Sequence, residues 1–435
     1  MNHWRRRDFL GASGGVLIGG AGARLMGAND RVNVAIVGLG GRGSDHIDSF
    51  ASLPGARIAA LCDVNQAARE RAVARVRKLN GSEPKTYADL RQVLEDKDVD
   101  AVSLATPNHW HALGTIWACQ AGKDVYTEKP ASYNIVEGRV MVEAARKHGR
   151  MVQVGTQNRS APHVQRAIEL VRQGAIGKIH LAKGFCYKRR PSIGHKPDAP
   201  VPPGLDWDMF LGPAPMRAFN ELRFKYNWHW FWDTGNGDIG NQGAHEMDIA
   251  RWGLNRQGWP KSIVCTGGKL LYEDDQETPN MQSAVFDYGD AQLVFEVRGL
   301  ITGGDEALKS DGQNTVGAIF YGSEGYLGVN SNGFRLFHGE KRELAKEESA
   351  GDADNGTAVH MDNFLKAVRS RKFSDLNADI QTGADSAALC HLANVSYRVR
   401  RKLDLDSSGN VTNDGEASAL YTRSYRSPYV LPTQV

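Results

Sequence analysis

The stretch Val32-Asn-Val-Ala-Ile-Val-Gly-Leu-Gly-Gly-Arg-Gly43 decides the fold of the N-terminal part of the chain. Its first six residues are mostly β-branched and apolar and predict a strand, and the residues after Gly43 can begin a helix. A glycine-rich turn between a strand and a helix is typical of a dinucleotide-binding unit, in which the phosphates lie on free amides at the helix N-terminus. Gly38 would permit the tight turn, Gly40 would leave room for the pyrophosphate, and Gly43 would allow the helix to pack closely on the strand. The predicted phosphate-binding residues are Gly38, Gly40, Gly41, Arg42 and Gly43.

A second apolar run, residues 57–62, ends at Asp63. An acidic side chain at this place in a Rossmann unit binds the hydroxyls of the adenosine ribose and repels a 2′-phosphate. The next residues, Val64 and Asn65, offer no cation to receive such a phosphate. We therefore predict NAD as the cofactor. Asp63 also suits the N-cap of a helix expected over residues 65–79, and the two roles are compatible.

Two further apolar runs, residues 100–105 and 124–127, predict strands that alternate with helices. This alternation predicts an N-terminal Rossmann domain over residues 31–155, of the α/β class, with a doubly wound parallel sheet. Ligands bind at the carboxyl ends of the strands in such sheets. We therefore expect the following residues to bind the nicotinamide half of the cofactor: Thr106, Asn108, His111, Glu128, Lys129 and Pro130.

The triplet Glu128-Lys129-Pro130 and a later glycine-rich segment, residues 235–248, carry a resemblance to a known family. Over residues 31–430 the chain resembles the Gfo/Idh/MocA oxidoreductases, named for glucose-fructose oxidoreductase, inositol dehydrogenase and a rhizopine-catabolism protein. The resemblance implies a sugar or polyol substrate, a homo-oligomer, and a catalytic lysine at position 129 beside the nicotinamide. An ammonium group there would hydrogen-bond to the reacting carbinol oxygen and stabilise charge as the hydride leaves. Taken alone, Lys129 is also compatible with a surface lysine; Pro130 is expected to fix the turn through a cis peptide bond.

The second signature of the family is an aspartate four residues before a histidine, followed by His-x-x-Asp. His245 and Asp248 match it, but Asn241 stands in place of the first aspartate. On one continuous helix these three residues would share a face, so we expect all three to point into the cleft as catalytic residues. His245 is the candidate general base, because its ordinary pKa lies close to physiological pH. Asp248 or Asp238 is expected to orient its ring in place of the missing carboxylate; a buried core histidine is the alternative.

Residues 226–233, Tyr-Asn-Trp-His-Trp-Phe-Trp-Asp, form a dense aromatic cluster. Its rings suit either a platform for the apolar faces of a sugar or the filling of a core, and the sequence leaves both open. Before this cluster, residues 191–207 are rich in Pro and Gly and predict a long loop that covers the cleft.

From Ser262 onwards, alternating polar and apolar residues predict strands joined in part by a hairpin turn at Gly289-Asp290. The expected strands are residues 263–271, 281–288, 291–300, 316–321 and 325–329. With the helices expected over residues 359–371 and 380–402, they predict an α+β domain over residues 156–435 with a large, mostly antiparallel open sheet. The resemblance implies that this domain serves substrate binding and oligomerisation.

Three expectations concern the C-terminal end of the chain. The second of these helices is expected to pack back on the Rossmann domain. Residues 347–355 are acidic and rich in small side chains and predict a solvated loop. The tail after Asp404 is expected to wrap a neighbouring subunit.

The first 28 residues differ from the rest of the chain. Arg5-Arg6-Arg7 precedes Asp8-Phe9-Leu10 and a Gly/Ala-rich run that reaches Ala28. This order is typical of a twin-arginine export signal, and its apolar core is too weak for a stable membrane span. We therefore expect a periplasmic or secreted protein without stable membrane association after export. An irregular basic N-terminus is the alternative.

Charge and cysteine usage exclude several other classes of protein. The 53 basic and 50 acidic residues give a net charge of +3, which predicts no nucleic-acid partner. The five cysteines lie far apart, without metal-ligand spacing, so we predict buried thiols and no metal site.

Three functions fit these observations. The first is an NAD-dependent oxidoreductase acting on a CH–OH group of a sugar, glycoside or polyol. The second is a glycosidase or lyase that uses the same site for transient oxidation, elimination and re-reduction. The third is a sensor of sugar and NAD without catalysis. If the protein is exported, it must also carry its cofactor with it.

Overall fold

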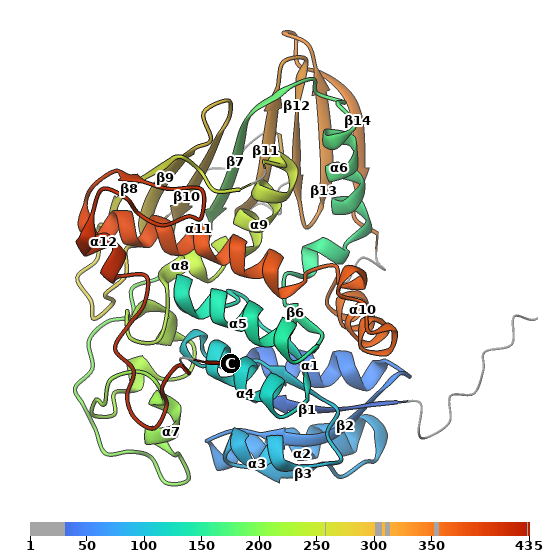
Figure 1. Cartoon of the computed structure of the whole chain (residues 1–435), viewed down its shortest axis with the longest axis vertical. Coiled ribbons are helices and arrows are strands. Elements are labelled where there is room, and N and C mark those ends of the chain that lie inside the picture. The colour runs from blue at the N-terminus through green and yellow to red at the C-terminus, as the bar shows by residue number, and fades with distance from the viewer. Residues whose placement is uncertain (1–30, 257, 301–306, 309–313, 352–355, 433) are drawn as a thin grey trace, which may run out of the picture.

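The computed structural model describes residues 31–256, 258–300, 307–308, 314–351, 356–432 and 434–435. A six-stranded sheet lies at one end of the molecule and a nine-stranded sheet at the other (Figure 1). The predicted export signal, residues 1–28, lies outside the described residues. None of the described helices is both long and apolar enough to cross a membrane.

The smaller sheet is parallel throughout and has the strand order β3-β2-β1-β4-β5-β6. This is the doubly wound order of a Rossmann domain, as predicted. Its strands are β1 Val32–Val37, β2 Ala56–Cys62, β3 Lys85–Tyr87, β4 Ala101–Leu104, β5 Asp124–Thr127 and β6 Val152–Val154. One face packs on α1 (Gly41–Ser52), α2 (Gln66–Asn80) and α10 (Gly356–Ser370), and the other on α3 (Leu90–Glu95), α4 (Asn108–Gln120) and α5 (Ile135–Lys147).

The larger sheet has the order β14-β13-β12-β11-β7-β10-β9-β8-β15 and is antiparallel except between β7 and β10. The prediction of a large, mostly antiparallel sheet is therefore confirmed. Its strands are β7 Ile179–Tyr187, β8 Ser262–Gly268, β9 Met281–Asp287, β10 Gln292–Arg298, β11 Thr315–Gly322, β12 Gly325–Asn330, β13 Gly333–His338, β14 Glu343–Ser349 and β15 Leu403–Asp404. Helices α6 (Pro162–Arg172), α9 (Gly243–Leu254) and α11 (Ile380–Val399) share its main core. The short helices are α7 (Trp207–Leu211), α8 (Gly237–Gly240) and α12 (Gly415–Ala419).

Four strands of the large sheet depart from the sequence expectations: β7, β13, β14 and β15. β7 lies in the middle of the large sheet, although no strand was expected there. β14 includes part of the segment expected to be a solvated loop, and it pairs with β13. Its side chains are mostly exposed and charged, which is how proteins protect an edge strand, and such a strand lacks the alternation that reveals strands in a sequence.

The C-terminal part of the chain returns to the Rossmann domain. α11 packs against α5 as well as α9, which confirms the expectation for this helix. α10 places Met361, Phe364 and Leu365 in one of the two cores of the parallel sheet. The division at residue 155 therefore does not separate the cores of the protein, because helices from beyond it complete the Rossmann domain.

The C-terminal tail packs on its own chain. The ring of Tyr429 meets that of Trp110 edge to face at 5.4 Å between centroids, and Arg426 pairs with Asp208 at 2.6 Å. Val435 is buried in the second core of the parallel sheet. The apolar partners of these residues lie within the same chain, and a contact of the tail with a neighbouring subunit stays a prediction.

The contribution of α10 is testable by truncating Phe364, whose ring packs edge to face on Tyr126 at 6.0 Å. Phe364→Ala should lower the free energy of unfolding by about 3–5 kcal/mol, because it leaves a cavity in a fully buried core. Urea denaturation measures this loss. The control is Lys366→Ala on the same helix, whose side chain is 72% exposed. Equal stability of the two variants would contradict the assignment of α10 to this core.

Candidate functional site

The glycine turn after β1 is tightly packed at two of its glycines. Gly38 has φ 84°, and a Cβ there would lie 2.6 Å from the carbonyl oxygen of Ala105. A Cβ on Gly43 would lie 1.9 Å from the carbonyl oxygen of Gly38. Both positions therefore require glycine, the first for the turn and the second for the contact between helix and strand.

Gly40 and Gly41 face open space instead. A Cβ at either position would meet no atom within 4 Å. The first intrahelical hydrogen bond of α1 runs from the amide of Ser44 to the carbonyl of Gly40, so the amides before Ser44 lie in the unpaired first turn. A cradle bordered by free amides fits the pyrophosphate of NAD.

Asp63 is held at the end of β2 by the backbone. Its carboxylate accepts hydrogen bonds from the amides of Leu39, at 2.7 Å, and Asn65, at 2.8 Å. Burial raises the pKa of Asp63, against the effect of these two bonds. The N-cap of α2 is Asn65, whose side chain accepts from the amide of Ala67, so the helix-capping role considered for Asp63 is wrong. The carboxylate is fixed beside the glycine turn, and its contact with the ribose stays a prediction.

Glu128 is the centre of a buried network at the end of β5. It accepts hydrogen bonds from Arg42 Nε at 2.7 Å and Gln157 Nε2 at 3.1 Å, and its Oε1 lies 3.0 Å from His46 Nε2. Burial alone would raise the pKa of Glu128, but the charge of Arg42 and the bond with His46 outweigh it and hold that pKa well below its usual range. Two predicted cofactor residues, Arg42 and Glu128, thus bind each other. Sequence reasoning missed His46 and Gln157, which no motif marks.

Lys129 follows directly and is joined to Pro130 by the expected cis peptide bond. Its Nζ donates to the backbone oxygen of Asn241 at 2.9 Å and to Oδ1 of Asn241 at 3.3 Å. Burial lowers the pKa of this amine, partly opposed by Glu128. Lys129 is therefore a partly buried lysine bound to Asn241 rather than a free surface lysine.

Asn241 does not lie on a continuous helix with His245 and Asp248. α8 ends at Gly240. Asn241, with φ −80° and ψ −94°, is not helical, and α9 starts only at Gly243. The expectation of one shared helical face is wrong for this physical reason. The break turns the backbone oxygen of Asn241 towards Lys129.

The two aspartates expected to orient His245 are bound elsewhere. Asp248 forms a two-pronged ion pair with Arg159, at 2.6 and 2.9 Å, and also accepts from Ser386 at 2.7 Å. Asp238 forms a similar pair with Arg190, at 2.7 and 2.9 Å. Such buried pairs leave no free carboxylate oxygen directed at the imidazole, and this expectation is wrong.

His245 lines a cavity of about 400 Å³. Its Nδ1 is buried, and no group among the described residues forms a hydrogen bond with it. Burial, together with the charge of Lys129, lowers the pKa of His245 to about 3. The ring is neutral at physiological pH and has an acceptor nitrogen to offer. The other side chains and backbone segments that line the cavity belong to Gln157, Asn158, Ala161, His163, Lys188, Gln242, Glu246, Ile249, Asn314, Val316, Gly317, Asn330, Ser331, Asn332, Gly356 and Thr357.

Of the remaining residues predicted to bind the nicotinamide, two side chains are bonded to neighbouring protein groups and one hydroxyl is not. Asn108 Nδ2 donates to Asn236 Oδ1 at 2.9 Å. The ring nitrogens of His111 lie 2.7 Å from the carbonyl of Pro130 and 2.9 Å from that of Thr106. Both side chains therefore support the loops around Lys129. Thr106 Oγ1 is buried without a hydrogen-bond partner among the described residues, which fits a contact with a bound cofactor.

The aromatic cluster fills a core in part, and its use as a sugar platform stays a prediction. Trp230 and Phe231 are buried. Tyr226 is 50% exposed, and its hydroxyl accepts from Asn241 Nδ2 and from Arg190 Nη1, each at 3.0 Å. Tyr226 thus belongs to the network around Lys129, while its neighbours fill the core.

The long loop before α7 reaches the Rossmann domain, in line with the expected cover. Leu205 forms an isolated β-bridge with Asn65, and the amide of Gln66 donates to the carbonyl of Gly204 at 2.8 Å. Leu205 also packs with Val64 against the aromatic side chains of α7. These contacts adjoin Asp63, beside which the adenosine is expected, and the covering role of the loop stays a prediction.

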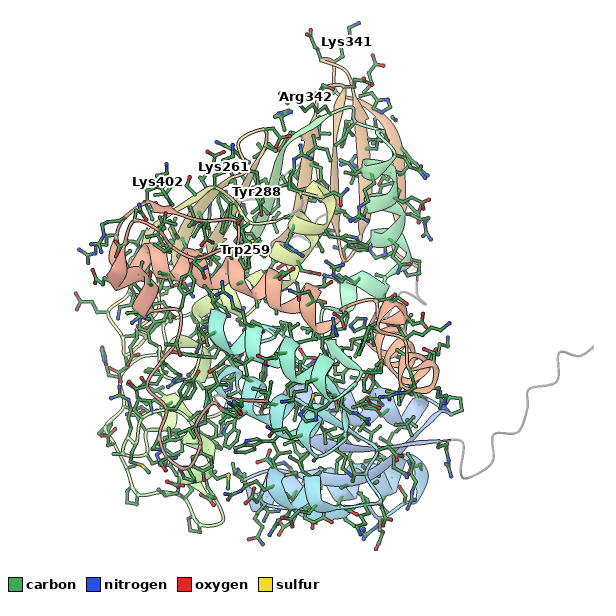
Figure 2. All side chains as sticks on the ribbon, in the orientation of Figure 1. Trp259, Lys261, Tyr288, Lys341, Arg342 and Lys402 are labelled. Carbon is green, nitrogen blue, oxygen red and sulfur yellow. The ribbon has the colours of Figure 1, made fainter. Side chains whose placement is uncertain are left out.

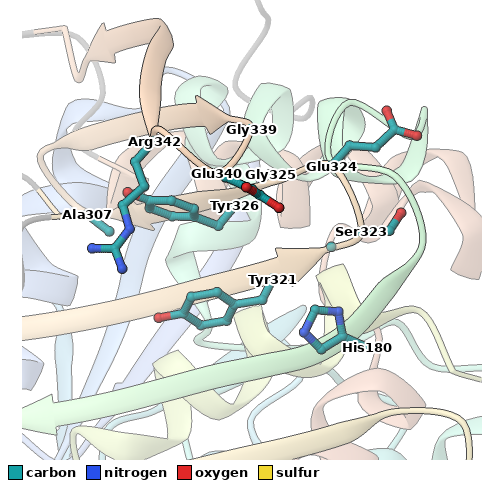
Figure 3. A pocket seen from close by; sticks show the side chains of 11 residues that line it. His180, Ala307, Tyr321, Ser323, Glu324, Gly325, Tyr326, Gly339, Glu340 and Arg342 are labelled. Atoms are coloured by element: carbon teal, nitrogen blue, oxygen red, sulfur yellow. The ribbon is translucent and has the colours of Figure 1, made fainter.

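A larger hollow, of about 740 Å³, lies at the far tip of the nine-stranded sheet. Figure 3 shows Tyr321, Tyr326, Arg342 and His180 around it, and Figure 2 places Arg342 at the end of the molecule opposite the Rossmann domain. It contains none of the predicted site residues.

All five cysteines are free and buried, as predicted, and no group of His, Cys, Asp and Glu within the described part of the chain is arranged to hold a metal ion.

Two family models match the chain. One describes the NAD-binding Rossmann fold of an oxidoreductase family and matches residues 32–156; the other describes the C-terminal α/β domain of that family and matches residues 164–292. The fold and the open glycine cradle thus define an NAD-binding oxidoreductase. The protein belongs to the Gfo/Idh/MocA family.

Individual relatives agree with this assignment. The uncharacterized oxidoreductase YrbE of Bacillus subtilis is 32% identical over 285 residues, 64% of this chain and 71% of its own length. A glycosyl hydrolase family 109 protein of Shewanella sp. (strain W3-18-1) is 29% identical over 227 residues, 45% of this chain, and the match spans only 50% of that relative. The WlbA dehydrogenase of Bordetella pertussis, solved with NADH and UDP-GlcNAcA, superposes with a TM-score of 0.64 at 21% identity, over 86% of this chain and 98% of that one.

The open cradle predicts a specific effect at Gly40. Gly40→Ala should leave the stability of the NAD-free protein unchanged but weaken NAD binding by about 1–3 kcal/mol, because the added methyl group occupies space meant for the ligand. Titration of NAD by intrinsic fluorescence measures this change. Gly415→Ala is the control, since a Cβ there also meets nothing within 4 Å but lies in α12. Unchanged NAD affinity in Gly40→Ala would place the pyrophosphate elsewhere.

Proposed function

We propose that this enzyme uses NAD to oxidise a CH–OH group of a sugar, glycoside or polyol. The proposal rests on the hydrogen bond between Lys129 and Asn241, which connects the lysine to the segment that lines the cavity. Lys129 Nζ is bonded to Asn241, and the next residue, Gln242, lines the cavity together with His245. Lys129 thus lies between Glu128, which binds Arg42 of the glycine turn, and the segment that lines the cavity.

The charges of the site suit proton removal from an alcohol. Lys129 can donate a hydrogen bond to the carbinol oxygen and stabilise the negative charge that develops there. Burial lowers the pKa of His245 to about 3, so the ring is neutral at neutral pH and its Nδ1 can accept a hydrogen bond from the hydroxyl. A ring with so low a pKa is a weak base, and the expectation that its pKa lies close to physiological pH is wrong. NAD, when bound, supplies the acceptor for the hydride. The network around Glu128 and the hydrogen bonds of Asn241 hold Lys129 in place.

Lys129→Met should reduce turnover by roughly two to four orders of magnitude, the usual range for a positioned proton donor or acceptor. Methionine keeps the length of the side chain and removes its charge, so NAD affinity should change little. Steady-state rates and NAD titration separate the two effects. Lys178→Met, on the exposed turn before β7, is the matched control. Parent-like turnover of Lys129→Met would refute the assigned site.

A second candidate function is a glycosidase or lyase that oxidises its substrate transiently, eliminates a substituent and returns the hydride. The similarity to the family 109 glycosyl hydrolases of Shewanella favours it. Screening glycosides with the NAD-loaded protein distinguishes the two. Net NADH formation supports a dehydrogenase, and aglycone release without net NADH supports the closed cycle. A sensor would give neither.

We further propose that the first 28 residues direct twin-arginine export to the periplasm or the medium, and that the folded protein carries NAD with it. A compartment without an assured NAD pool requires slow dissociation of the cofactor. The bridge between Leu205 and Asn65 supports such retention, because it would have to open before the adenosine end could leave. Retention favours a redox cycle that closes on the enzyme.

The purified protein should contain near-stoichiometric NAD(H) and turn over without added cofactor. Gly204→Ala should accelerate NAD release roughly tenfold, because Gly204 has φ 77° and a side chain there costs about 1–2 kcal/mol in addition to its contact with Gln66. Stopped-flow displacement of bound NADH measures this rate.

Gly194→Ala provides the control for backbone strain. Gly194 lies in the same loop with φ 68°, but a Cβ there meets nothing within 4 Å. Equal rates of NAD release in the two variants would show that the bridge between Leu205 and Asn65 does not retain NAD. Protein that is isolated empty, with activity strictly dependent on added NAD, would refute retention itself.

A further inference from the structure

Glu246 follows His245 directly in α9 and lines the same cavity. It is only 3% exposed. Its Oε1 accepts one long hydrogen bond, 3.4 Å from Gln242 Nε2, and its Oε2 is buried without a hydrogen-bond partner among the described residues. No part of the proposed mechanism uses this side chain. A carboxyl group with so few donors is poorly stabilised as an anion in a protein interior.

The groups around Glu246 do not supply the missing stabilisation. Burial raises the pKa of Glu246 to about 8, and the charge of Lys129 opposes this rise only in part. Asp238 of α8 raises it further. His245 is neutral, and the thiols Cys186 of β7 and Cys390 of α11, which sense the charge of Glu246, are themselves protonated because burial raises their pKa values. Lys188 lies on the cavity wall and donates to Gln242 at 3.3 Å.

We propose that Glu246 contacts the substrate as a neutral carboxylic acid, donating its proton in a hydrogen bond to an oxygen of the sugar beside the carbon that is oxidised. This inference rests on the proposed function, because it places the sugar in the cavity that His245 lines. The site would then hold the substrate between an acceptor, His245 Nδ1, and a donor, the Glu246 hydroxyl. A neutral hydroxyl or ether oxygen of a sugar satisfies this donor.

Ionisation of Glu246 would remove the donor and leave an anion facing the substrate. Substrate binding should therefore weaken as pH rises above about 8. Below that pH the acid is protonated and binding should be independent of this group. A purely structural role for Glu246 would not give this dependence, because the packing of the side chain does not require a substrate.

The test combines infrared spectroscopy with kinetics on the NAD-loaded protein. The difference spectrum between the parent and Glu246→Gln at pH 7 should contain the C=O band of a protonated carboxylic acid. The probes for kinetics are D-glucose, methyl β-D-glucoside and myo-inositol, with reduction of bound NAD followed by absorbance. For a probe that is oxidised, the parent KM should rise roughly tenfold per pH unit above about 8, the slope of a single titration.

Three variants complete the design. Glu246→Gln keeps a neutral donor and should lose the pH dependence of KM. Glu246→Leu removes the donor and should raise KM by roughly ten- to hundredfold at pH 7, the loss expected for a buried hydrogen bond of about 1–3 kcal/mol. Glu169→Gln, exposed on α6, should retain the parent profile. An ionised carboxylate at pH 7, or a KM that rises equally in Glu246→Gln, would overturn the inference. Failure of every probe to reduce NAD would instead contradict the proposed function, and the infrared band would still report on Glu246.

Discussion

The ion pair between Glu128 and Arg42 joins the end of β5 to the first turn of α1, and the site depends on it. Arg42 belongs to the glycine turn, and Glu128 directly precedes Lys129 in the chain. Gly155 leaves the necessary room, since a Cβ there would lie 2.8 Å from the carboxylate. Removing one member would strand a buried charge, which costs far more than the loss of an exposed ion pair. The position of Lys129 is therefore coupled to the conformation of the glycine turn through this ion pair.

Burial lowers the pKa of Lys129, and the charges around the amine oppose this shift only in part. Asp238 and Asp248 are neutralised by arginines, and an amide, Asn241, meets the lysine where a carboxylate would have fixed its charge. Burial shifts the pKa values of Lys129, His245 and Glu246 towards their neutral forms, and at Lys129 the charge of Glu128 opposes this shift in part.

The glycine turn, Asp63 and Glu128-Lys129-Pro130 could be predicted because residue type alone decides their backbone geometry or their place at a strand end. The role of Asn241 could not, because the helix break after Gly240 depends on tertiary contacts. Glu246 was missed because a glutamate beside a histidine in a helix carries no signal of burial. β14 escaped detection since both of its faces are polar, and the partner of α10 could not be read from its periodicity. What the sequence lacked in each case was the identity of a distant neighbour.

Because α10 and the C-terminal tail pack on the parallel sheet, the Rossmann domain cannot fold completely in the order in which it is synthesised. β1 leaves the ribosome early, but the apolar side chains that cover it from α10 are made more than three hundred residues later. The nucleotide-binding half therefore cannot complete its core as an independent co-translational unit. Both halves must mature together once the chain is released, and contacts of such long sequence separation are the ones that slow folding and expose a nascent chain to chaperones.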